Sequence, residues 1–416
     1  MTSSHALSAR HRQLQLSTRW VAREILSDAH SATWSLPSPQ QRFAATQPYY
    51  AQMVEAGLLK QCISVDAGGE CVGYMDLAII AEELFAVDAS VSLTLLSTVL
   101  GLTPLILGGT AEQRHRMLAP FLETHGTPLA AFASSEPGGS ANAGAAPPAE
   151  GVRTSARRDG DEWVISGSKQ WISSAGGWDE LGADLTTVVC RTGDAASPSR
   201  GVSVIAVPRA AAGFRLDRHF ETLGLRSHSL PHVTFDELRT RQDNLIGTEN
   251  AGLALVSASF GGFAAIVGIF GVGLMRAAFD HAFSFARNER RGGVQPIIEH
   301  QAVGHALAEA KMLIEAARSL CWRACHAMDD RQPGATELAV QAKIFGSETA
   351  IQVIGRLMNV VGVDSFNHDL QLARLLQDAY VLPLIAGGNL GMRRGQLHAL
   401  LRDPGYDSLA TIGGAA

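Results

Sequence analysis

The chain has 416 residues, of which 46% are hydrophobic and 18% are charged, and its formal net charge is −6. A chain of this length is expected to form two or three structural units around apolar cores. The acidic balance and the low charge content argue against a nucleic-acid binder, whose surface carries clustered lysine and arginine.

Residues 1–128 are predicted to form an N-terminal α-helical domain. Apolar residues recur at helical spacing in stretches such as YMDLAIIAEELFAV and SVSLTLLSTVLGLTPLIL, and the turn sequences GG, PSP and GGT separate these stretches.

Residues 129–246 are predicted to form a central β domain of six to eight strands. Its segments, among them LTTVVCRT, GVSVIAVPR and HVTFDEL, are short, alternating and bounded by Gly, Pro or Asp.

Residues 247–416 are predicted to form a C-terminal bundle of four long helices. Within it, residues 252–275 lack any charge over 24 positions, which is long enough to cross a bilayer. This stretch contains six glycines and continues into the amphipathic sequence RAAFDHAFSFARNERR, so we expect a helix buried inside the bundle and no membrane span. Its small residues would let a neighbouring backbone or a flat cofactor approach closely.

Five cysteines, scattered along the chain, suit a reducing compartment because their number is odd. Cys321 and Cys325 share a face of a predicted helix, but no second pair of histidines or cysteines completes a zinc site, so structural thiols and no metal are expected. The first residues, MTSSHALSARHRQLQ, lack the apolar region of a secretory signal. We therefore expect a cytoplasmic protein.

Common nucleotide and hydrolase motifs are missing from the sequence. No predicted strand is followed by GxGxxG, and the nearest match, GIFGVG at 268–273, has the wrong spacing and lies inside a predicted helix. Neither a phosphate-binding GxxxxGK[ST] loop nor a GxSxG nucleophile motif is present. A Rossmann dehydrogenase, a P-loop NTPase and an α/β-hydrolase are therefore not expected.

Two motifs in the central domain are candidates for contact with a flat ring system. In FASSEPGGSANAG (132–144), backbone N–H groups and hydroxyls at a glycine-rich turn can meet a ring that gains negative charge when reduced. In GSKQWISSAG (167–176), the face of Trp171 could cover a planar cofactor. Either motif alone also fits an ordinary loop, but the two together favour a cofactor site.

Five segments resemble the acyl-CoA dehydrogenase superfamily in order and spacing, and they span nearly the whole chain: SSEPGGS, ISGSKQWIS, LGLRSHSLPHVTFDEL, NERRGGVQPIIEHQAV and QDAYVLPLIAGGN. Within that superfamily, RFAATQPYY, GDEWVISGSKQW and GGVQPIIEHQ are most similar to the nitroalkane oxidase type. The resemblance implies an α+β fold with an N-terminal helical domain, a central β-sheet or barrel domain and a C-terminal four-helix bundle. It also implies an FAD-dependent oxidoreductase.

The resemblance implies that FAD lies between the central domain and the C-terminal bundle. Along the pyrimidine edge of the flavin the matching positions are Phe132, Ser134 and Ser135, and beside the isoalloxazine they are Trp171 and Ser173. The resemblance implies a small-molecule substrate, with O₂ as a possible second substrate. It implies no nucleic-acid or membrane partner.

Other matching positions reach the adenosine diphosphate half of an FAD that a neighbouring subunit binds. They are Arg290 and Gln301, while Gly362 and the loop around Gly388 complete the cradle. The fork of Arg290 suits pairing with phosphate, although an exposed charge at a helix end is the alternative. This arrangement implies an oligomer, a homotetramer built as a dimer of dimers.

Proton removal from a carbon beside a thioester or nitro group requires a carboxylate within reach. In this family the carboxylate directly precedes the glycine of LPLIAGGN, as Glu in most dehydrogenases and Asp in nitroalkane oxidases, and here Ala386 takes that position. Some relatives place a Glu on the long buried helix, at a position that aligns with Phe263. Ala264 replaces an arginine of many acyl-CoA enzymes, which argues against a CoA ester.

Several interpretations of Ala386 stay open at this stage. Another group, Asp378, His228 or His232, could act as the base. Alternatively, the substrate needs no deprotonation, or the protein is a monooxygenase in which Phe263 and Ala386 shelter reduced flavin and O₂ from water. The scaffold could also retain weak activity, Ala386 could be an introduced substitution, or the protein could bind flavin without turnover.

Arg393 matches an arginine that pairs with the catalytic carboxylate in nitroalkane oxidases. Without that partner it could hold a carboxylate, nitronate or phosphate of the substrate, turn to FAD, or be a solvated surface residue.

Overall fold

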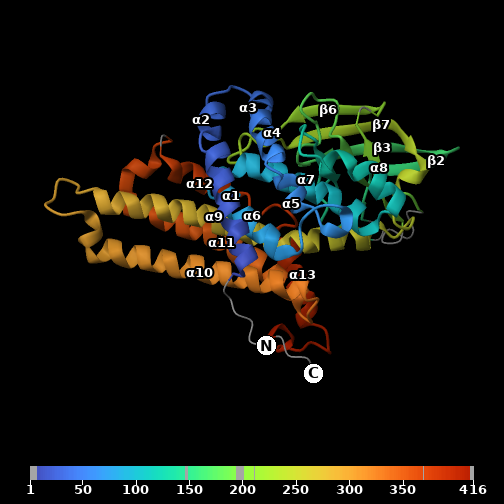
Figure 1. Ribbon diagram of the computed structural model, residues 1–416. Coiled ribbons are helices and arrows are strands. Elements are labelled where there is room, and N and C mark those ends of the chain that lie inside the picture. The colour runs from blue at the N-terminus through green and yellow to red at the C-terminus, as the bar shows by residue number, and fades with distance from the viewer. Residues whose placement is uncertain (1–6, 146–148, 194–200, 210, 369, 413–416) are drawn as a thin grey trace.

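The computed structural model describes residues 7–145, 149–193, 201–209, 211–368 and 370–412. The expected α+β architecture is confirmed, with helices at both ends of the sequence and a sheet between them. Figure 1 shows the sheet at one end of the molecule and the long C-terminal helices extending away from it. The division of the chain after residues 128 and 246 stays a prediction.

The N-terminal unit is helical, and α6 and α7 are the most deeply buried of its helices. Its helices are α1 (Ala9–Leu26), α2 (Ala29–Trp34), α3 (Pro39–Ala45), α4 (Gln47–Glu55), α5 (Leu58–Cys62), α6 (Tyr74–Phe85), α7 (Ala89–Gly108) and α8 (Ala111–Leu122). Side chains define their starts: the hydroxyl of Ser38 accepts from Gln41 N and is followed by a proline, and Thr110 forms a capping box with Gln113.

The central unit is an eight-stranded mixed sheet, which confirms the expected six to eight strands. Its strands are β1 (Ala130–Ala133), β2 (Ser155–Asp159), β3 (Glu162–Gln170), β4 (Leu185–Arg191), β5 (Val202–Pro208), β6 (Phe214–His219), β7 (Pro231–Arg241) and β8 (Leu245–Ile246). They lie in the order β6-β7-β3-β2-β4-β5-β8, and β1 pairs in parallel with β4. Strands β4 and β5 are buried along nearly their whole length because α7 and α9 cover them.

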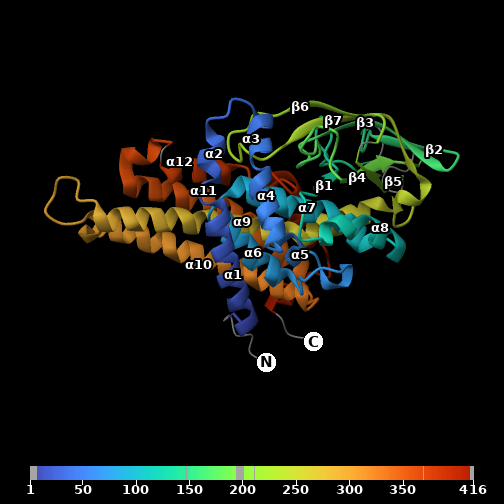
Figure 2. The same ribbon diagram turned by 45° about the horizontal axis from the view of Figure 1, so that its top comes forward.

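The C-terminal unit is built on three long helices. These are α9 (Gly252–Asn288), α10 (Gln301–Asp329) and α11 (Ala335–Val361), and they are followed by the shorter α12 (Gln371–Tyr380) and α13 (Arg394–Leu401). The fourth helix packed on the bundle, α12, has ten residues and is therefore shorter than the sequence suggests. Figure 2 shows α9, α10 and α11 running together toward the end of the molecule away from the sheet.

Small residues let α9 and α11 pack closely. A Cβ atom added to Gly268 would lie 2.5 Å from the carbonyl oxygen of Ala342, and one added to Gly271 would lie 2.5 Å from that of Gly346. By length and composition, α7 and α9 could each cross a membrane, but 72% and 56% of their most apolar windows are buried inside the protein. The expected buried helix at 252–275 is therefore confirmed from Phe263 to Met275, which are all buried.

Candidate active site

The loop that precedes α13 places Ala386 in an unusual backbone conformation. Ala386 has a φ of 49°, in the left-handed region that few non-glycine residues adopt, and Gly387 follows with a φ of 79°. A π-helical turn, η6 (Asn389–Arg393), comes next. Such turns are rare and occur often at functional sites. The loop is closed by a hydrogen bond of 2.8 Å from Asn389 N to the carbonyl of Pro383.

The guanidinium of Arg393 lies against this loop and is buried, with 3% of the residue exposed. It donates to the carbonyl of Ala386 at 2.7 Å and 3.2 Å, to the carbonyl of Phe260 at 3.1 Å and to Gln396 Oε1 at 2.9 Å. Within the described residues Arg393 forms no ion pair. Burial lowers its pKa to about 10. The interpretation of Arg393 as a solvated surface residue is therefore wrong.

A second buried cation, Lys343 of α11, lies under the same loop. Its Nζ donates to the carbonyl of Gly387 at 2.8 Å and to Asn389 Oδ1 at 2.7 Å. Asn389 in turn donates to Ser347 Oγ and Glu348 Oε1. Burial and then the nearby charge of Arg393 lower the pKa of Lys343 to about 7. The sequence offered one signal for this residue, a lone lysine among the apolar positions of a predicted helix.

Aromatic rings connect this loop to the predicted flavin-binding segment. Phe132, at the end of β1, stacks on Phe260 of α9 with ring centroids 4.8 Å apart and an interplanar angle of 18°. Because the carbonyl of Phe260 also accepts a hydrogen bond from Arg393, the predicted residues Phe132, Ala386 and Arg393 lie in one contiguous cluster. Phe263 follows on α9 and is 6% exposed. Phe260 is not among the residues predicted from the sequence, although its separation of three positions from Phe263 places both on one helix face.

The turn that carries Ser134 and Ser135 is held in place by a buried ion pair. Lys169 Nζ lies 2.9 Å from Glu136 Oε1 and donates to the carbonyl of Ser134 at 3.2 Å. Gln170 N donates to the carbonyl of Ser135 at 3.0 Å. Burial alone would raise the pKa of Glu136, but the charge of Lys169 and the hydrogen bonds from Lys169, Arg153 and Thr154 together outweigh it, and the pKa falls to about 2. Both serines are half-buried at the end of β1.

Trp171 and Ser173, which the sequence analysis expects beside a flat ring, directly follow β3. Trp171 has a φ of 61°, is 49% exposed and stacks on Phe220 with centroids 3.9 Å apart. Ser173 Oγ lies 3.0 Å from His228 Nε2. The next hydroxyl, Ser174 Oγ, is buried and has no hydrogen-bond partner among the residues that the structure describes.

The three groups proposed as replacement bases have contacts of their own. Asp378 Oδ1 accepts from Leu225 N at 2.6 Å, and burial raises the pKa of this carboxyl to about 6. His228 is buried between Thr94 and Ser173. His232 Nδ1 lies 3.7 Å from Asp217 Oδ2, while its Nε2 is buried without a partner in the described part of the chain.

The residues predicted to reach the adenosine diphosphate half of FAD lie far from these groups. Arg290 is exposed and donates to the carbonyl of Val294, and Gln301 begins α10. Gly362, with a φ of 78°, ends α11 next to Arg291, which pairs with Asp364 at 2.8 Å. Figures 1 and 2 show the connection from α9 to α10 at the end of the molecule away from the sheet. One chain therefore does not unite both halves of the predicted FAD site.

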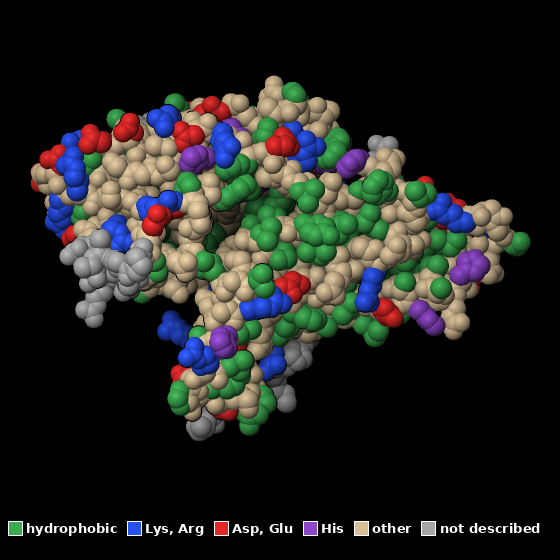
Figure 3. Space-filling model, turned by 180° about the vertical axis from the view of Figure 1, so that it is seen from behind, with side chains coloured by type: hydrophobic (Ala, Val, Ile, Leu, Met, Phe, Trp, Pro, Cys, Tyr) green, Lys and Arg blue, Asp and Glu red, His purple; other side chains and the backbone are tan. Residues whose placement is uncertain are grey.

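Apolar side chains gather near the middle of the molecular face drawn in Figure 3, which is the rear face in the view of Figure 1. The most exposed of the large apolar side chains in the C-terminal unit, apart from Val294, are Val363, Phe366, Leu384 and Leu390, each at least 73% exposed.

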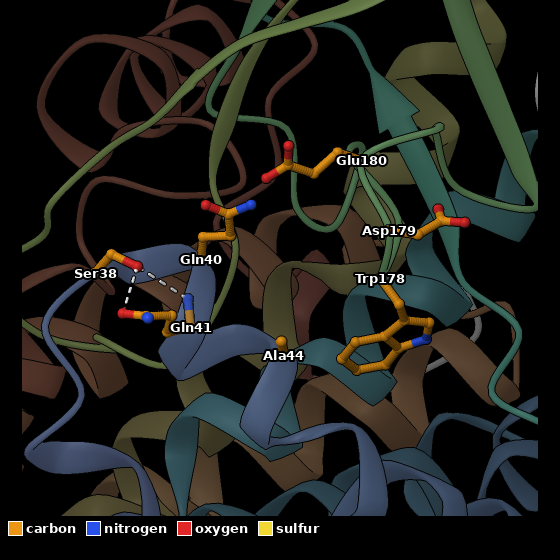
Figure 4. A pocket seen from close by; sticks show the side chains of 7 residues that line it. All are labelled: Ser38, Gln40, Gln41, Ala44, Trp178, Asp179 and Glu180. Atoms are coloured by element: carbon orange, nitrogen blue, oxygen red, sulfur yellow. Dashed lines mark hydrogen bonds between the residues drawn. The ribbon is translucent and has the colours of Figure 1, made fainter.

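A surface pocket of about 680 Å³ lies between α3 and the loop after β3 (Figure 4). It is lined by Ser38, Gln40, Gln41, Ala44, Trp178, Asp179 and Glu180. Its hydroxyl, Ser38 Oγ, is already bonded to Gln41 as the cap of α3, and no predicted site residue lines the pocket.

The chain belongs to the acyl-CoA dehydrogenase family. The models of its N-terminal, middle and C-terminal domains match residues 8–125, 131–238 and 250–400. The family resemblance and its consequence, a flavin-dependent oxidoreductase, are thereby confirmed.

Within this family the chain is a flavoenzyme of the nitroalkane oxidase type. It is 40% identical to nitroalkane oxidase of Podospora anserina over 98% of each chain, and 36% identical to that of Fusarium oxysporum over 95% and 94%. A nitroalkane oxidase active-site mutant crystallised with 1-nitrooctane superposes with a TM-score of 0.95 at 34% identity, covering 99% and 100% of the two chains. Another similar structure is described as a flavoprotein, in agreement with the predicted FAD.

Proposed function

We propose that this protein oxidises a small nitroalkane-like substrate at the carbon next to its electron-withdrawing group, with Ala386 in the position of the usual catalytic carboxylate. The observation that carries the proposal is the contact between Arg393 and the Ala386 carbonyl. One similar structure was determined to analyse the roles of an arginine and an aspartate seven positions apart in nitroalkane oxidase, the same separation as Arg393 and Ala386. Two other similar structures are of nitroalkane oxidase active-site mutants crystallised with 1-nitrooctane and with 1-nitrohexane.

The side chains present at the site fit FAD. Trp171 offers a half-exposed ring, and Ser174 Oγ is a buried polar atom that lacks a partner in the described chain. Phe132, Ser134, Ser135 and Ser173 would contact the flavin, which when bound accepts the electron pair removed from the substrate carbon. The neighbouring rings of Phe260 and Phe263 would exclude water from the reacting carbon.

Arg393 would hold the negative charge of the substrate. Among the described residues this buried guanidinium donates only to neutral oxygens, so its charge is uncompensated there, and an anion beside it removes that cost. With alanine at 386, the loop itself supplies no carboxylate to take the proton from a neutral nitroalkane. A nitronate, which has already lost that proton, therefore suits the site better than its conjugate acid.

A second copy of the chain would supply Arg290, Gln301 and Gly362. The connection from α9 to α10 lies at the end of the molecule away from the sheet (Figures 1 and 2), and the end of α11 is joined to that connection by the ion pair between Arg291 and Asp364. The exposed apolar side chains of the C-terminal unit suit burial between copies. We extend the proposal to a homotetramer in the cytoplasm.

Anaerobic stopped-flow tests the proposed substrate. The FAD-loaded protein is mixed with a preformed nitronate, with the neutral nitroalkane or with an acyl-CoA, and the flavin absorbance near ~450 nm is followed. Bleaching by the nitronate, with much slower bleaching by the neutral nitroalkane, supports the proposal. If none of the three bleaches the flavin, the oxidase function is wrong, and a reaction of reduced flavin with O₂ becomes the next candidate.

A further inference from the structure

A buried hydrogen-bonded chain connects the N-terminal helices to the segment after β3. Thr94 Oγ1 of α7 lies 2.9 Å from His228 Nδ1, and His228 Nε2 lies 3.0 Å from Ser173 Oγ. His228 is 3% exposed, and burial lowers its pKa to about 3, so the imidazole is neutral. A neutral imidazole has one donor and one acceptor nitrogen. The partners of the two nitrogens therefore decide which atom donates in each of these hydrogen bonds.

The contacts of Thr94 settle which atom donates. Its hydroxyl proton is donated to the carbonyl of Ser90 at 3.1 Å, one helical turn earlier. Thr94 Oγ1 is therefore an acceptor for Nδ1–H of His228, and Nε2 must accept. The hydroxyl proton of Ser173 then points to His228 Nε2, which leaves only lone pairs of Ser173 Oγ for any other partner.

His228 has little freedom to leave this position. Its loop is fixed to α12 by the hydrogen bond from Leu225 N to Asp378, and His228 N donates to the carbonyl of Leu225 at 2.9 Å. Ser227 Oγ, next to it, donates to Thr33 Oγ1 at 2.8 Å.

We infer that His228 is a positioning residue which makes Ser173 a hydrogen-bond acceptor toward the flavin, and so favours the reduced flavin over the oxidised one. The inference depends on the proposed placement of Ser173 beside the isoalloxazine. Reduction converts acceptor nitrogens of this ring into N–H donors, and an acceptor on the protein stabilises a donor while it repels another acceptor.

The test is the reduction potential of the bound flavin, measured against a reference dye. His228→Leu removes the acceptor, so the Ser173 proton becomes free to turn to the oxidised ring. Thr94→Val removes the acceptor of Nδ1–H without adding bulk. The imidazole proton can then move to Nε2, and the hydroxyl proton of Ser173 must turn away from His228. We expect both variants to shift the equilibrium toward oxidised flavin by about 3- to 10-fold, or ~15–30 mV for a two-electron couple. His228→Gln, whose amide oxygen can replace Nε2 as acceptor, should restore most of the potential.

Ser173→Ala separates this inference from the proposed site. If Ser173→Ala changes neither the potential nor the visible spectrum of the flavin, Ser173 is not beside the ring and its proposed placement is wrong. If Ser173→Ala changes them while Thr94→Val and His228→Leu do not, the role of His228 is wrong. In the Ser173→Ala background, His228→Leu should cause no further shift. Should His228→Leu lose FAD, Thr94→Val alone decides the outcome.

Discussion

At the scale of single residues, the loop around Ala386 combines two features that cost stability. Its alanine adopts a left-handed conformation, and two buried basic residues, Lys343 and Arg393, lie next to it; within the part of the chain that the structure describes, neither pairs with a buried acid. A left-handed alanine costs roughly 1–2 kcal/mol, and an uncompensated buried charge adds to this cost. Features of this kind persist where the surrounding structure enforces them, and they cluster at functional sites.

Lys343 makes the stability of the protein depend on pH, and the sign of this dependence follows from the pKa of Lys343. The pKa falls from 10.5 to about 7 on folding, because burial and Arg393 disfavour the charged form. The contribution of Lys343 to the unfolding free energy is therefore fully present above pH 10.5. It decreases as the pH falls from 10.5 toward 7, and it is lost once the pH has fallen through the folded pKa of about 7. Between pH 7 and pH 9 the unfolding free energy should rise relative to that of Lys343→Met, by at most ~1.4 kcal/mol per pH unit.

Urea unfolding of both proteins at several pH values measures this difference. A difference that stays constant, or that shrinks as the pH rises, would show that Lys343 remains charged in the folded protein. Lys311→Met, on the exposed surface of α10, serves as the matched control and should show no such slope.

At the scale of elements, the packing of α9 on α11 depends on glycines that admit no side chain. Gly268→Ala would place a Cβ atom 2.5 Å from the carbonyl of Ala342 and 2.7 Å from Cys321 Sγ, so we expect a loss of about 1–3 kcal/mol in stability. Gly261→Ala on the same helix meets nothing within 4 Å and should stabilise the helix by up to ~1 kcal/mol. Chemical denaturation of both variants tests the pair, and equal effects would contradict this account of the packing.

Most elements could be predicted from the sequence because they depend on local patterns. The helical period of 252–288 and the alternation of β7 are visible without a structure. The family motifs predict that Phe132 and Trp171 lie near a cofactor, and this placement stays a prediction. The stacking of Phe260 on Phe132, the burial of Arg393 and the contacts of Lys343 could not be predicted. They arise where α9, α11 and the 383–393 loop meet, and such tertiary contacts leave no periodic signal.

At the scale of the whole molecule, the predicted FAD contacts are divided between two distant regions. If a second copy completes the site, Arg290→Ala should weaken FAD binding, even though Arg290 belongs to the connection from α9 to α10, which Figure 1 shows at the end of the molecule away from the sheet. Loss of a charged hydrogen bond to phosphate predicts about 10-fold weaker binding. Arg287→Ala, an exposed arginine three residues earlier on α9, is the control and should bind FAD normally.

Flavin fluorescence titration measures the affinity, and light scattering gives the mass of the FAD-loaded protein. A 44.1 kDa monomer that binds FAD as tightly after Arg290→Ala as before would contradict the shared site.

The most direct test of the central claim is to return a carboxylate to position 386. Asp and Asn both tolerate the left-handed backbone found there, so Ala386→Asp and Ala386→Asn differ only in the presence of a base. The measurement is the anaerobic rate of flavin bleaching by a neutral nitroalkane. We predict that Ala386→Asp is about 10²–10⁴-fold faster than both Ala386→Asn and the unaltered protein. Equal rates for the Asp and Asn variants, with FAD retained in both, would show that position 386 is not the site of the missing base.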